Sequence, residues 1–295
     1  MAERVAVIGA GAIGGMLALG ACEAGHDVTV CVRTPIPSLT VERDGTATVV
    51  PARIADDPAD VGPADWVLLT TKGYQTAGAE PWLRALAGPG TVVVVVQNGV
   101  EHAERLAAVA RPPVGAVLPA LCYIGAQRSG PGLVRHVYGD TLIVPGDGDG
   151  ERLASLFAGG SVRVARSADF LTEAWRKLLV NAAANPVTAL TGRPLGVLDE
   201  PGIAALMRGL LTEALTAAKA AGAHLSVDDV TATMDFYAGL GPAQGTSMLE
   251  DRTAGRPLEY EEITGAVVRT AARHALDVPL NQAVLALLSA VSPAA

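Results

Sequence analysis

Residues 5–15 read VAVIGAGAIGG, a short apolar run that passes directly into a turn rich in glycine. Because residues 4–8 (RVAVI) are almost wholly apolar, they predict a strand that is buried on both faces. A helix is predicted over residues 12–24, and a second run, DVTVCV at residues 27–32, predicts the next strand. A strand, a helix and a second strand in this order indicate a βαβ unit with two parallel strands in one sheet.

The glycines of this turn, Gly9, Gly11 and Gly14, form the pattern G-x-G-x-x-G between the strand and the helix. In this position the pattern indicates a dinucleotide site. Gly9 permits a tight turn, Gly11 lets the backbone approach a pyrophosphate, and Gly14 lets the helix pack closely on the strand. The free N–H groups and the positive dipole end of the helix then face the phosphates. The alternative is that the glycines serve only to pack helix against strand. The predicted cofactor contacts are Gly9, Gly11, Ala12, Ile13 and Gly14.

The chain divides into two parts of different character. Two more apolar runs, WVLLTT at 66–71 and TVVVVV at 91–96, predict further parallel strands, and residues 114–144 have the pattern of a β-rich meander. After about residue 166 the apolar periodicity becomes helical. We therefore predict an α/β domain of the Rossmann type over residues 1–166 and an all-α domain over residues 167–295, with ligand in a cleft between them. The predicted helices span residues 170–190, 201–222, 226–239, 258–275 and 279–291.

The composition argues against several classes of protein, among them nucleic-acid-binding and membrane proteins. The 295 residues are 50% hydrophobic and 18% charged, and the net charge of −8 argues against a nucleic-acid groove or a surface for anionic membranes. The three cysteines show no metal-ligand spacing and are expected to be buried thiols in a reducing compartment. No apolar run approaches the ~20 residues needed to cross a bilayer, and the N-terminus does not resemble a signal peptide. We expect a cytoplasmic protein that binds neither nucleic acid nor membrane and holds no metal.

The end of the second predicted strand indicates which dinucleotide binds. Enzymes that hold NAD by its ribose hydroxyls carry Asp or Glu at this place, ~20 residues after the glycine turn. Here the sequence places Arg33 and Thr34 instead. A guanidinium attracts the 2′-phosphate of NADP and can bind it at two points, whereas a carboxylate would repel it. Arg33 therefore predicts NADPH rather than NADH, and the alternative is a solvated arginine in a loop.

Polar residues follow two other predicted strands. Lys72 comes directly after WVLLTT, and Gln97–Asn98–Gly99 follows TVVVVV. Ligands of open parallel sheets bind outside the carboxyl ends of the strands, so Lys72 and Asn98 are expected beside the cofactor or the substrate. The alternative for Asn98 is an ordinary turn residue at the end of a strand.

A line of polar side chains interrupts the first predicted helix of the second domain. In EAWRKLLVNAAANPVTAL, residues 173–190, Lys177, Asn181 and Asn185 are spaced four apart, which places them on one face. A face that simply meets water is usually filled with Glu, Lys, Gln and Arg, which cost less helix propensity than asparagine. The stripe is therefore predicted to line a polar cleft, with a solvent-facing stripe as the alternative. Pro186 is expected to kink or end this helix.

Five segments, taken in order, resemble the ketopantoate reductase (2-dehydropantoate 2-reductase) family, and the match covers almost the whole chain. The resemblance implies a Rossmann domain joined to a helical domain like that of 6-phosphogluconate dehydrogenases. It also implies an NADPH-dependent enzyme that reduces the C2 ketone of a small 2-oxo acid. The five segments are GAGAIGG (9–15), TTKGYQT (70–76), VQNGV (96–100), WRKLLVNAAANPVTAL (175–190) and TSMLEDRTAGRPLEYEEITGAVV (246–268).

The resemblance implies roles for the stripe. Lys177 takes the place of the family's catalytic lysine, and Asn181 and Asn185 take the two asparagine positions after it, where they would bind substrate. An ammonium aimed at the ketone oxygen stabilises the charge that develops as hydride reaches C2, and can then donate a proton. Lys72 and Asn98 match positions near the cofactor and the substrate.

The resemblance also implies roles near the C-terminus. Ser247 matches a serine that binds the substrate carboxylate, with Asp251 in the acidic position four residues later. Glu259 matches the carboxylate that accepts a hydrogen bond from the substrate hydroxyl, and it is expected near the cofactor as well. Two further acids leave the choice of carboxylate open: Glu261 and Glu262.

Three functions are compatible with these residues. An NADPH-dependent ketopantoate reductase is favoured, and a reductase of another 2-oxo acid on the same fold is the second. The third is a protein that binds NADP(H) as a sensor without turnover, which would not need Lys177, Asn181 and Glu259 as a set. The Ala-rich helices could pack within one chain or across a homodimer.

Overall fold

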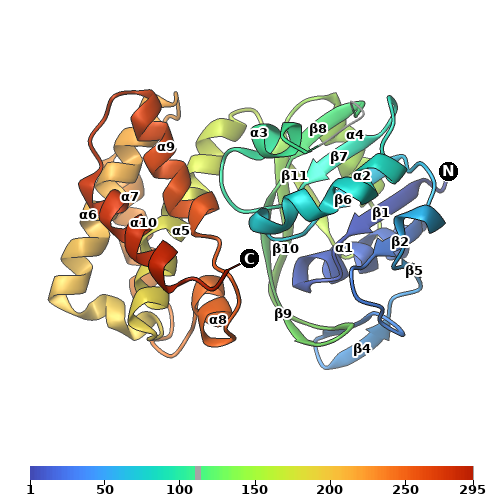
Figure 1. Ribbon diagram of the computed structural model, residues 1–295, viewed down its shortest axis with the longest axis horizontal. Coiled ribbons are helices and arrows are strands. Elements are labelled where there is room, and N and C mark those ends of the chain that lie inside the picture. Colours follow the sequence, from blue (N-terminus) through green and yellow to red (C-terminus); the bar gives the residue numbers. More distant parts are fainter. Residues whose placement is uncertain (110–113, 295) are drawn as a thin grey trace. The chain divides into compact units, whose positions relative to one another are not determined.

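The structure is a computed structural model that describes residues 1–109 and 114–294. The chain forms two compact units (Figure 1). We call Met1–Gln97 with His102–Phe170 the sheet unit, and Asn98–Glu101 with Leu171–Ala295 the helical unit. The division falls at residue 170 rather than at 166, because the strand Arg163–Ser167 still pairs within the sheet unit. Four residues that the sequence pattern groups with the first domain, Asn98–Glu101, belong to the helical unit.

The main sheet of the sheet unit is parallel and has six strands in the order β5-β2-β1-β6-β7-β8. In chain order of its strands this is 3-2-1-4-5-6, the order of the dinucleotide-binding Rossmann sheet. Side chains of β1 alternate between two cores: Val5 and Val7 pack into one, Ala6 and Ile8 into the other. The strands are β1 Arg4–Ile8, β2 Asp27–Cys31, β5 Arg53–Ala55, β6 Trp66–Leu69, β7 Val92–Val95 and β8 Ala116–Pro119.

A second sheet in the same unit has the order β11-β10-β3-β4, with β9 also paired to β10. The predicted β-rich region 114–144 is therefore shared: β8 completes the main sheet, and the antiparallel pair β9–β10 builds the second sheet. Helix α1 (Ala12–Glu23) packs closely on β10, since a Cβ on Gly15 would lie 2.8 Å from Cγ2 of Val134. The strands are β3 Thr40–Arg43, β4 Thr46–Val49, β9 Leu121–Gly130, β10 Leu133–Pro145 and β11 Arg163–Ser167, and the remaining α-helices are α2 Glu80–Leu86, α3 His102–Ala107 and α4 Gly148–Leu156.

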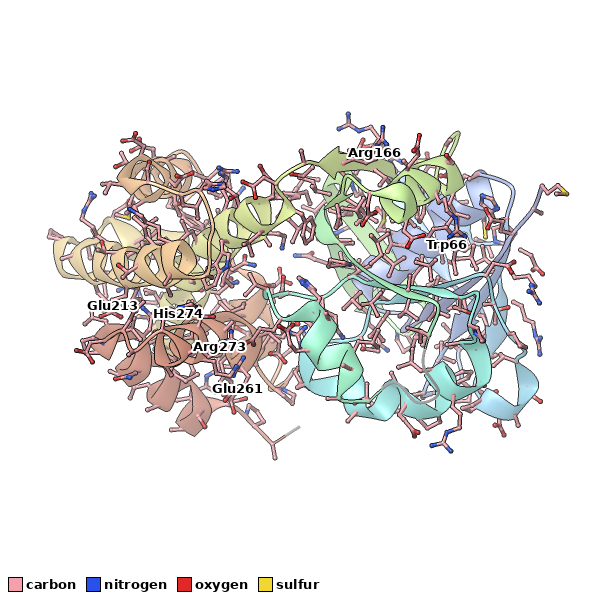
Figure 2. The ribbon with its side chains drawn as sticks, turned by 90° about the horizontal axis from the view of Figure 1, so that it is seen from above. Trp66, Arg166, Glu213, Glu261, Arg273 and His274 are labelled. Atoms are coloured by element: carbon pink, nitrogen blue, oxygen red, sulfur yellow. The ribbon has the colours of Figure 1, made fainter. Side chains whose placement is uncertain are left out.

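The helical unit packs its helices around one apolar core built mostly of Leu, Val and Ala. Glu213, which is labelled in Figure 2, lies on α6 and fixes the start of α10. Its carboxylate accepts hydrogen bonds from the backbone N–H groups of Leu280 and Asn281, each at 2.9 Å. The α-helices are α5 Phe170–Thr191, α6 Pro201–Ala220, α7 Val227–Ala238, α8 Ser247–Thr253, α9 Ala266–Arg273 and α10 Pro279–Val291, and a π-helical turn, Glu261–Gly265, precedes α9.

The fifth helix covers the range predicted for it, 170–190, and extends one residue further. It runs through Pro186 to Thr191, so the proline does not end it. Residues 182–189 are all buried, and packing on both sides of the proline stabilises the helix where propensity alone would break it. Among the described residues, no helix has the length and apolar character to span a membrane.

Candidate active site

The glycine turn of the sheet unit has the geometry that its pattern predicts. Gly9 has φ +108°, a conformation that glycine adopts without strain, and its N–H donates to the carbonyl of Cys31 at 3.0 Å. A Cβ on Gly14 would lie 1.8 Å from the Gly9 carbonyl oxygen and 2.6 Å from Oγ1 of Thr70. Gly9 thus makes the tight turn, and Gly14 permits the close contact of helix with turn.

Gly11 has a different environment. It is the N-cap of α1, and a Cβ there would meet no described protein atom within 4 Å. Packing within the protein therefore does not call for glycine at this position, whereas close approach of a ligand to the backbone would. The first turn of α1 contains Ala12 and Ile13 and carries no acidic side chain, so its positive dipole end is not neutralised there. These features fit a pyrophosphate.

Two polar positions, Arg33 and Lys72, share the edge of the main sheet with this turn. Ile8 at the end of β1 lies between Cys31 of β2 and Leu69 of β6 in register. Arg33 follows Cys31 by two residues and is exposed, and Lys72 follows Leu69 by three and is half-buried. An arginine at the end of β2 fits the 2′-phosphate of NADP in charge and in shape.

In the helical unit the structure joins four of the predicted site residues, which we call the Asn98 cluster: Asn98, Lys177, Asn181 and Glu259. Lys177 Nζ donates to Asn98 Oδ1 at 3.3 Å, and Asn181 Nδ2 lies 3.5 Å from the same oxygen. Asn98 Nδ2 donates to Glu259 Oε2 at 3.1 Å. Lys177 and Asn181 are one turn apart on α5, so their spacing of four residues brings both to one amide.

The orientation of the Asn98 amide follows from the charges on its two sides. The oxygen of the Asn98 amide faces the Lys177 ammonium, and its nitrogen faces the Glu259 carboxylate. Glu259 is 5% exposed, and a carboxylate buried to this degree requires hydrogen-bond donors. The cluster thus places a cation and a carboxylate on opposite ends of a single amide.

The geometry also separates the three acids between which the sequence could not choose. Glu259 is the one that contacts Asn98. Glu261 is exposed and its carboxylate accepts from Arg269 Nη1 at 2.6 Å. Glu262 is buried, with 5% exposure. Of the three carboxylates, that of Glu259 is therefore the one with a described hydrogen bond to Asn98.

Asn185 and Ser247 lie on two different helices of the helical unit, α5 and α8. Asn185 is buried on α5, one turn beyond Asn181, and Ser247 is exposed at the first position of α8. The start of α8 is fastened to α5, because the hydroxyls of Thr246 and Thr188 lie 2.7 Å apart. Asp251, in turn, is buried and accepts from Arg256 Nε at 2.8 Å.

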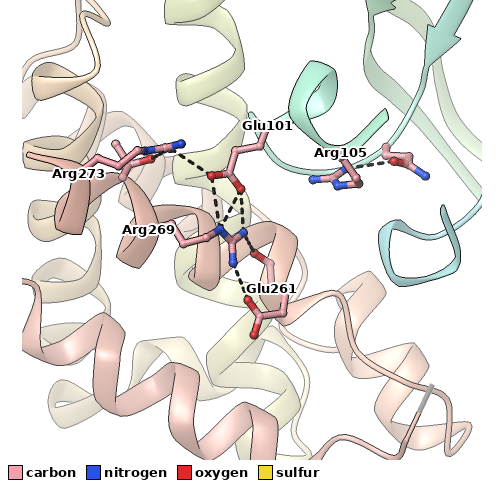
Figure 3. Close-up of polar contacts among 7 residues, drawn as sticks. Glu101, Arg105, Glu261, Arg269 and Arg273 are labelled. Carbon is pink, nitrogen blue, oxygen red and sulfur yellow. Dashed lines mark hydrogen bonds and ion pairs between the residues drawn. The ribbon is translucent and has the colours of Figure 1, made fainter. Parts of the chain in front are cut away.

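An ion-pair network beside the cluster was not predicted from the sequence. It consists of Glu101, Glu261, Arg269 and Arg273 (Figure 3). Arg269 Nη2 donates to Glu101 Oε2 at 2.8 Å, and Arg273 Nη2 donates to Glu101 Oε1 at 3.1 Å. The available signal was the spacing of the two arginines, four apart on one helix, which places both on one face.

The network keeps Arg269 charged. Burial alone would lower the pKa of Arg269, but its hydrogen bonds to Glu101 and Glu261 and the charges of both carboxylates raise the pKa above its ordinary value. Glu101 is the most enclosed member, with a side chain that is 13% exposed.

Family models match most of the chain. The family model described as ketopantoate reductase PanE/ApbA matches residues 5–149, and the model of its C-terminal part matches residues 169–292. The chain belongs to the ketopantoate reductase family. The two family models therefore cover both the glycine turn and the helices of the second unit.

Two curated members of the ketopantoate reductase family are similar over their full length. The 2-dehydropantoate 2-reductase of Caulobacter vibrioides is 40% identical over 98% of this chain and 99% of its own. That of Mycobacterium tuberculosis is 38% identical over 99% of each chain. Among solved structures, a ketopantoate reductase from Staphylococcus aureus described as dimeric has a TM-score of 0.88 at 28% identity, covering 98% of both chains.

Proposed function

We propose that this chain is an NADPH-dependent 2-dehydropantoate 2-reductase, which reduces the C2 ketone of ketopantoate to the hydroxyl of pantoate. Membership of the family and the names of its full-length relatives support the reaction. The observation that carries the proposal is the Asn98 amide, which joins Lys177 to Glu259. A cation for a ketone oxygen and a carboxylate for a hydroxyl stand together there, as this substrate requires.

The protein's part in the chemistry is to orient the ketone and to stabilise charge. NADPH, when bound, supplies the hydride. The Lys177 ammonium points at the ketone oxygen, stabilises the negative charge that develops on it and then donates a proton. An alkoxide is far more basic than an amine, so this proton transfer is downhill. Asn98 holds the ammonium in place by accepting its hydrogen bond at 3.3 Å, and Asn181 holds the Asn98 amide by donating to the same oxygen at 3.5 Å.

Different residues recognise the hydroxyl and the carboxylate of the substrate. Glu259 accepts the 4-hydroxyl of ketopantoate, and Asn185 and Ser247 bind the carboxylate end. A substrate without the hydroxyl leaves the buried acceptor with one donor fewer, which costs about 1–3 kcal/mol. The site should therefore prefer a 4-hydroxylated 2-oxo acid over its deoxy analogue.

The cofactor proposal rests on the sheet unit. Gly9, Gly11 and Gly14, with Ala12 and Ile13, would hold the pyrophosphate, and Arg33 would bind the 2′-phosphate. We also assign Lys72, Asn98 and Glu259 to the surroundings of the cofactor, from their places in the family pattern. The open position at Gly11 and the exposed guanidinium at the end of β2 support this assignment.

A panel of 2-oxo acids tests the proposal. NADPH oxidation is followed by absorbance with ketopantoate, with its deoxy analogue 3,3-dimethyl-2-oxobutanoate, and with pyruvate. Efficient oxidation with ketopantoate and weak oxidation with the other two is expected. A different preference would favour a reductase of another 2-oxo acid, and tight NADPH binding without oxidation would favour a sensor. Light scattering tests a homodimer, which we propose from the likeness to the Staphylococcus aureus enzyme described as dimeric.

A further inference from the structure

We propose that Arg269 is a positioning residue for the reaction, which holds the Asn98–Glu259 pair in place by binding both of the chain segments that carry it. The inference rests on the proposed function, but Arg269 itself lies outside the Asn98 cluster. It acts through Glu101 on one side and through Glu261 on the other.

The first segment, Asn98–Glu101, is held in the helical unit at several points. Gly99 has φ +99°, which favours glycine and bends the chain directly after Asn98. Val100 packs against the apolar core of the unit. Glu101 accepts from Arg269 Nη2 at 2.8 Å and from Arg269 Nε at 3.1 Å, a two-point contact that a lysine could not reproduce.

The second segment begins at Glu259 and continues into the π-helical turn Glu261–Gly265. Arg269 Nη1 donates to the Glu261 carboxylate, and Arg269 Nη2 donates to the Glu261 carbonyl, both at 2.6 Å. Gly265 leaves room for this contact, since a Cβ there would lie 2.6 Å from Glu261 Oε2 and 2.9 Å from Arg269 Nη1. The wider π-helical turn and the glycine thus accommodate the guanidinium.

The contacts of Arg269 link the same two chain segments as the Asn98–Glu259 hydrogen bond. Glu101 is three residues after Asn98, and Glu261 is two residues after Glu259. One guanidinium therefore binds both chain segments, two or three residues from the pair whose 3.1 Å hydrogen bond joins them. Arg273 contacts only the Glu101 side of this arrangement among the acids of the network, through a bond at 3.1 Å. It should contribute less than Arg269.

The experiment compares Arg269→Ala and Arg269→Lys with Arg193→Ala as the matched control. Arg193 also pairs with a glutamate of the helical unit, Glu200 at 2.8 Å, but is not linked to Asn98. For Arg269→Ala we expect kcat/KM for ketopantoate to fall by about tenfold to a hundredfold, as misplacement of a reacting group does. The loss should appear mainly in kcat. Lysine should restore only part of it, and Arg193→Ala should have wild-type activity.

Two further readouts separate positioning from general damage. Because Arg269 acts by holding Asn98 against Glu259, adding Arg269→Ala to Asn98→Ala should cost much less activity than Arg269→Ala costs in the wild-type protein. Hydrogen–deuterium exchange on the whole protein should speed up in the peptide that contains residues 98–101 and remain unchanged in α6. Additive losses in the double variant, or unchanged exchange at residues 98–101, would overturn the inference. If the wild-type protein does not reduce ketopantoate, the proposed function fails, and the exchange measurement still tests Arg269.

Discussion

Asn98 and Glu259 are 161 residues apart in the chain, and a hydrogen bond of 3.1 Å joins their side chains. The same amide meets Lys177 through its oxygen at 3.3 Å. An ammonium, a neutral amide and a carboxylate therefore share one short chain of contacts.

Removal of the proposed general acid should abolish turnover and leave the fold intact. For Lys177→Ala we expect kcat to fall by roughly 10²–10⁴, the range that general acid catalysis contributes. The melting temperature should change little, because Lys177 is only half-buried. Lys219→Ala, an exposed lysine on α6, serves as the control. NADPH oxidation and thermal unfolding measure the two effects, and near-normal turnover of Lys177→Ala would contradict the assignment.

A charge placed at Asn98 should add a new ionisation to the activity. In Asn98→Asp two carboxylates face each other where an amide donated to Glu259, and such a pair raises the pKa of one member. Protonation of the pair restores a donor, so activity should recover as the pH falls through that raised pKa. Asn98→Ala has no donor to regain and should show no such recovery. The pH profiles of kcat/KM check this, and identical profiles for both variants would speak against the contact.

The cofactor preference should depend on Arg33. A hydrogen bond to a charged group contributes about 1.5–3 kcal/mol, so Arg33→Ala should lower kcat/KM for NADPH by roughly tenfold to a hundredfold. The value for NADH, which lacks the 2′-phosphate, should change much less. Arg166→Ala, an exposed arginine of β11 (Figure 2), is the control for a lost positive charge. An equal loss with both cofactors would show that Arg33 does not bind the phosphate.

Two glycines of the same turn should respond in opposite ways to alanine. Gly14→Ala forces a Cβ to within 1.8 Å of the Gly9 carbonyl oxygen, so the turn must shift and the melting temperature should fall. Gly11→Ala meets no described protein atom within 4 Å and should fold normally. Its defect should instead be a weaker affinity for NADPH, measured by fluorescence titration. Normal NADPH affinity in Gly11→Ala would argue that the glycine has no role in binding.

Two cysteines should be unreactive in the folded protein. Burial raises the pKa of the Cys31 thiol to about 12 and that of the Cys22 thiol to about 11. Because the thiolate is the nucleophile, a raised pKa leaves almost none of the reactive form at pH 8. Iodoacetamide should therefore modify both residues slowly until urea unfolds the chain, as peptide mass spectrometry would report. Rapid modification of the native protein at Cys31 would contradict the burial.

Much of the main sheet of the sheet unit could be predicted from the sequence, because the patterns that indicate its elements are local. The strand β1, the glycine turn and α1 follow one another within 20 residues, and each has its own pattern in that short length. The stripe of Lys177 and Asn181 could be found for the same reason, since helical periodicity places both on one face. The second sheet could not be predicted, because β10 pairs with β3, which precedes it by about 90 residues.

The partners of the stripe could not be predicted from periodicity. Asn98 lies 79 residues before Lys177, and no repeating pattern connects a loop to a helix. The family resemblance supplied Asn98 and Glu259, but it did not indicate that they contact each other. Arg269 and Glu101 were missed altogether, because an arginine on an exposed-looking helix and a glutamate in a loop have the same sequence pattern as other solvated charges.

The membership of Asn98–Glu101 in the helical unit limits how the protein can be divided. A gene fragment that encodes residues 171–295 would keep Lys177 and Glu259 and lose the amide that connects them. Chimeras that exchange helical halves between related enzymes would likewise need to carry a four-residue graft from the other half of the gene. Without that graft, each hybrid would combine an asparagine loop from one parent with a partner surface from the other.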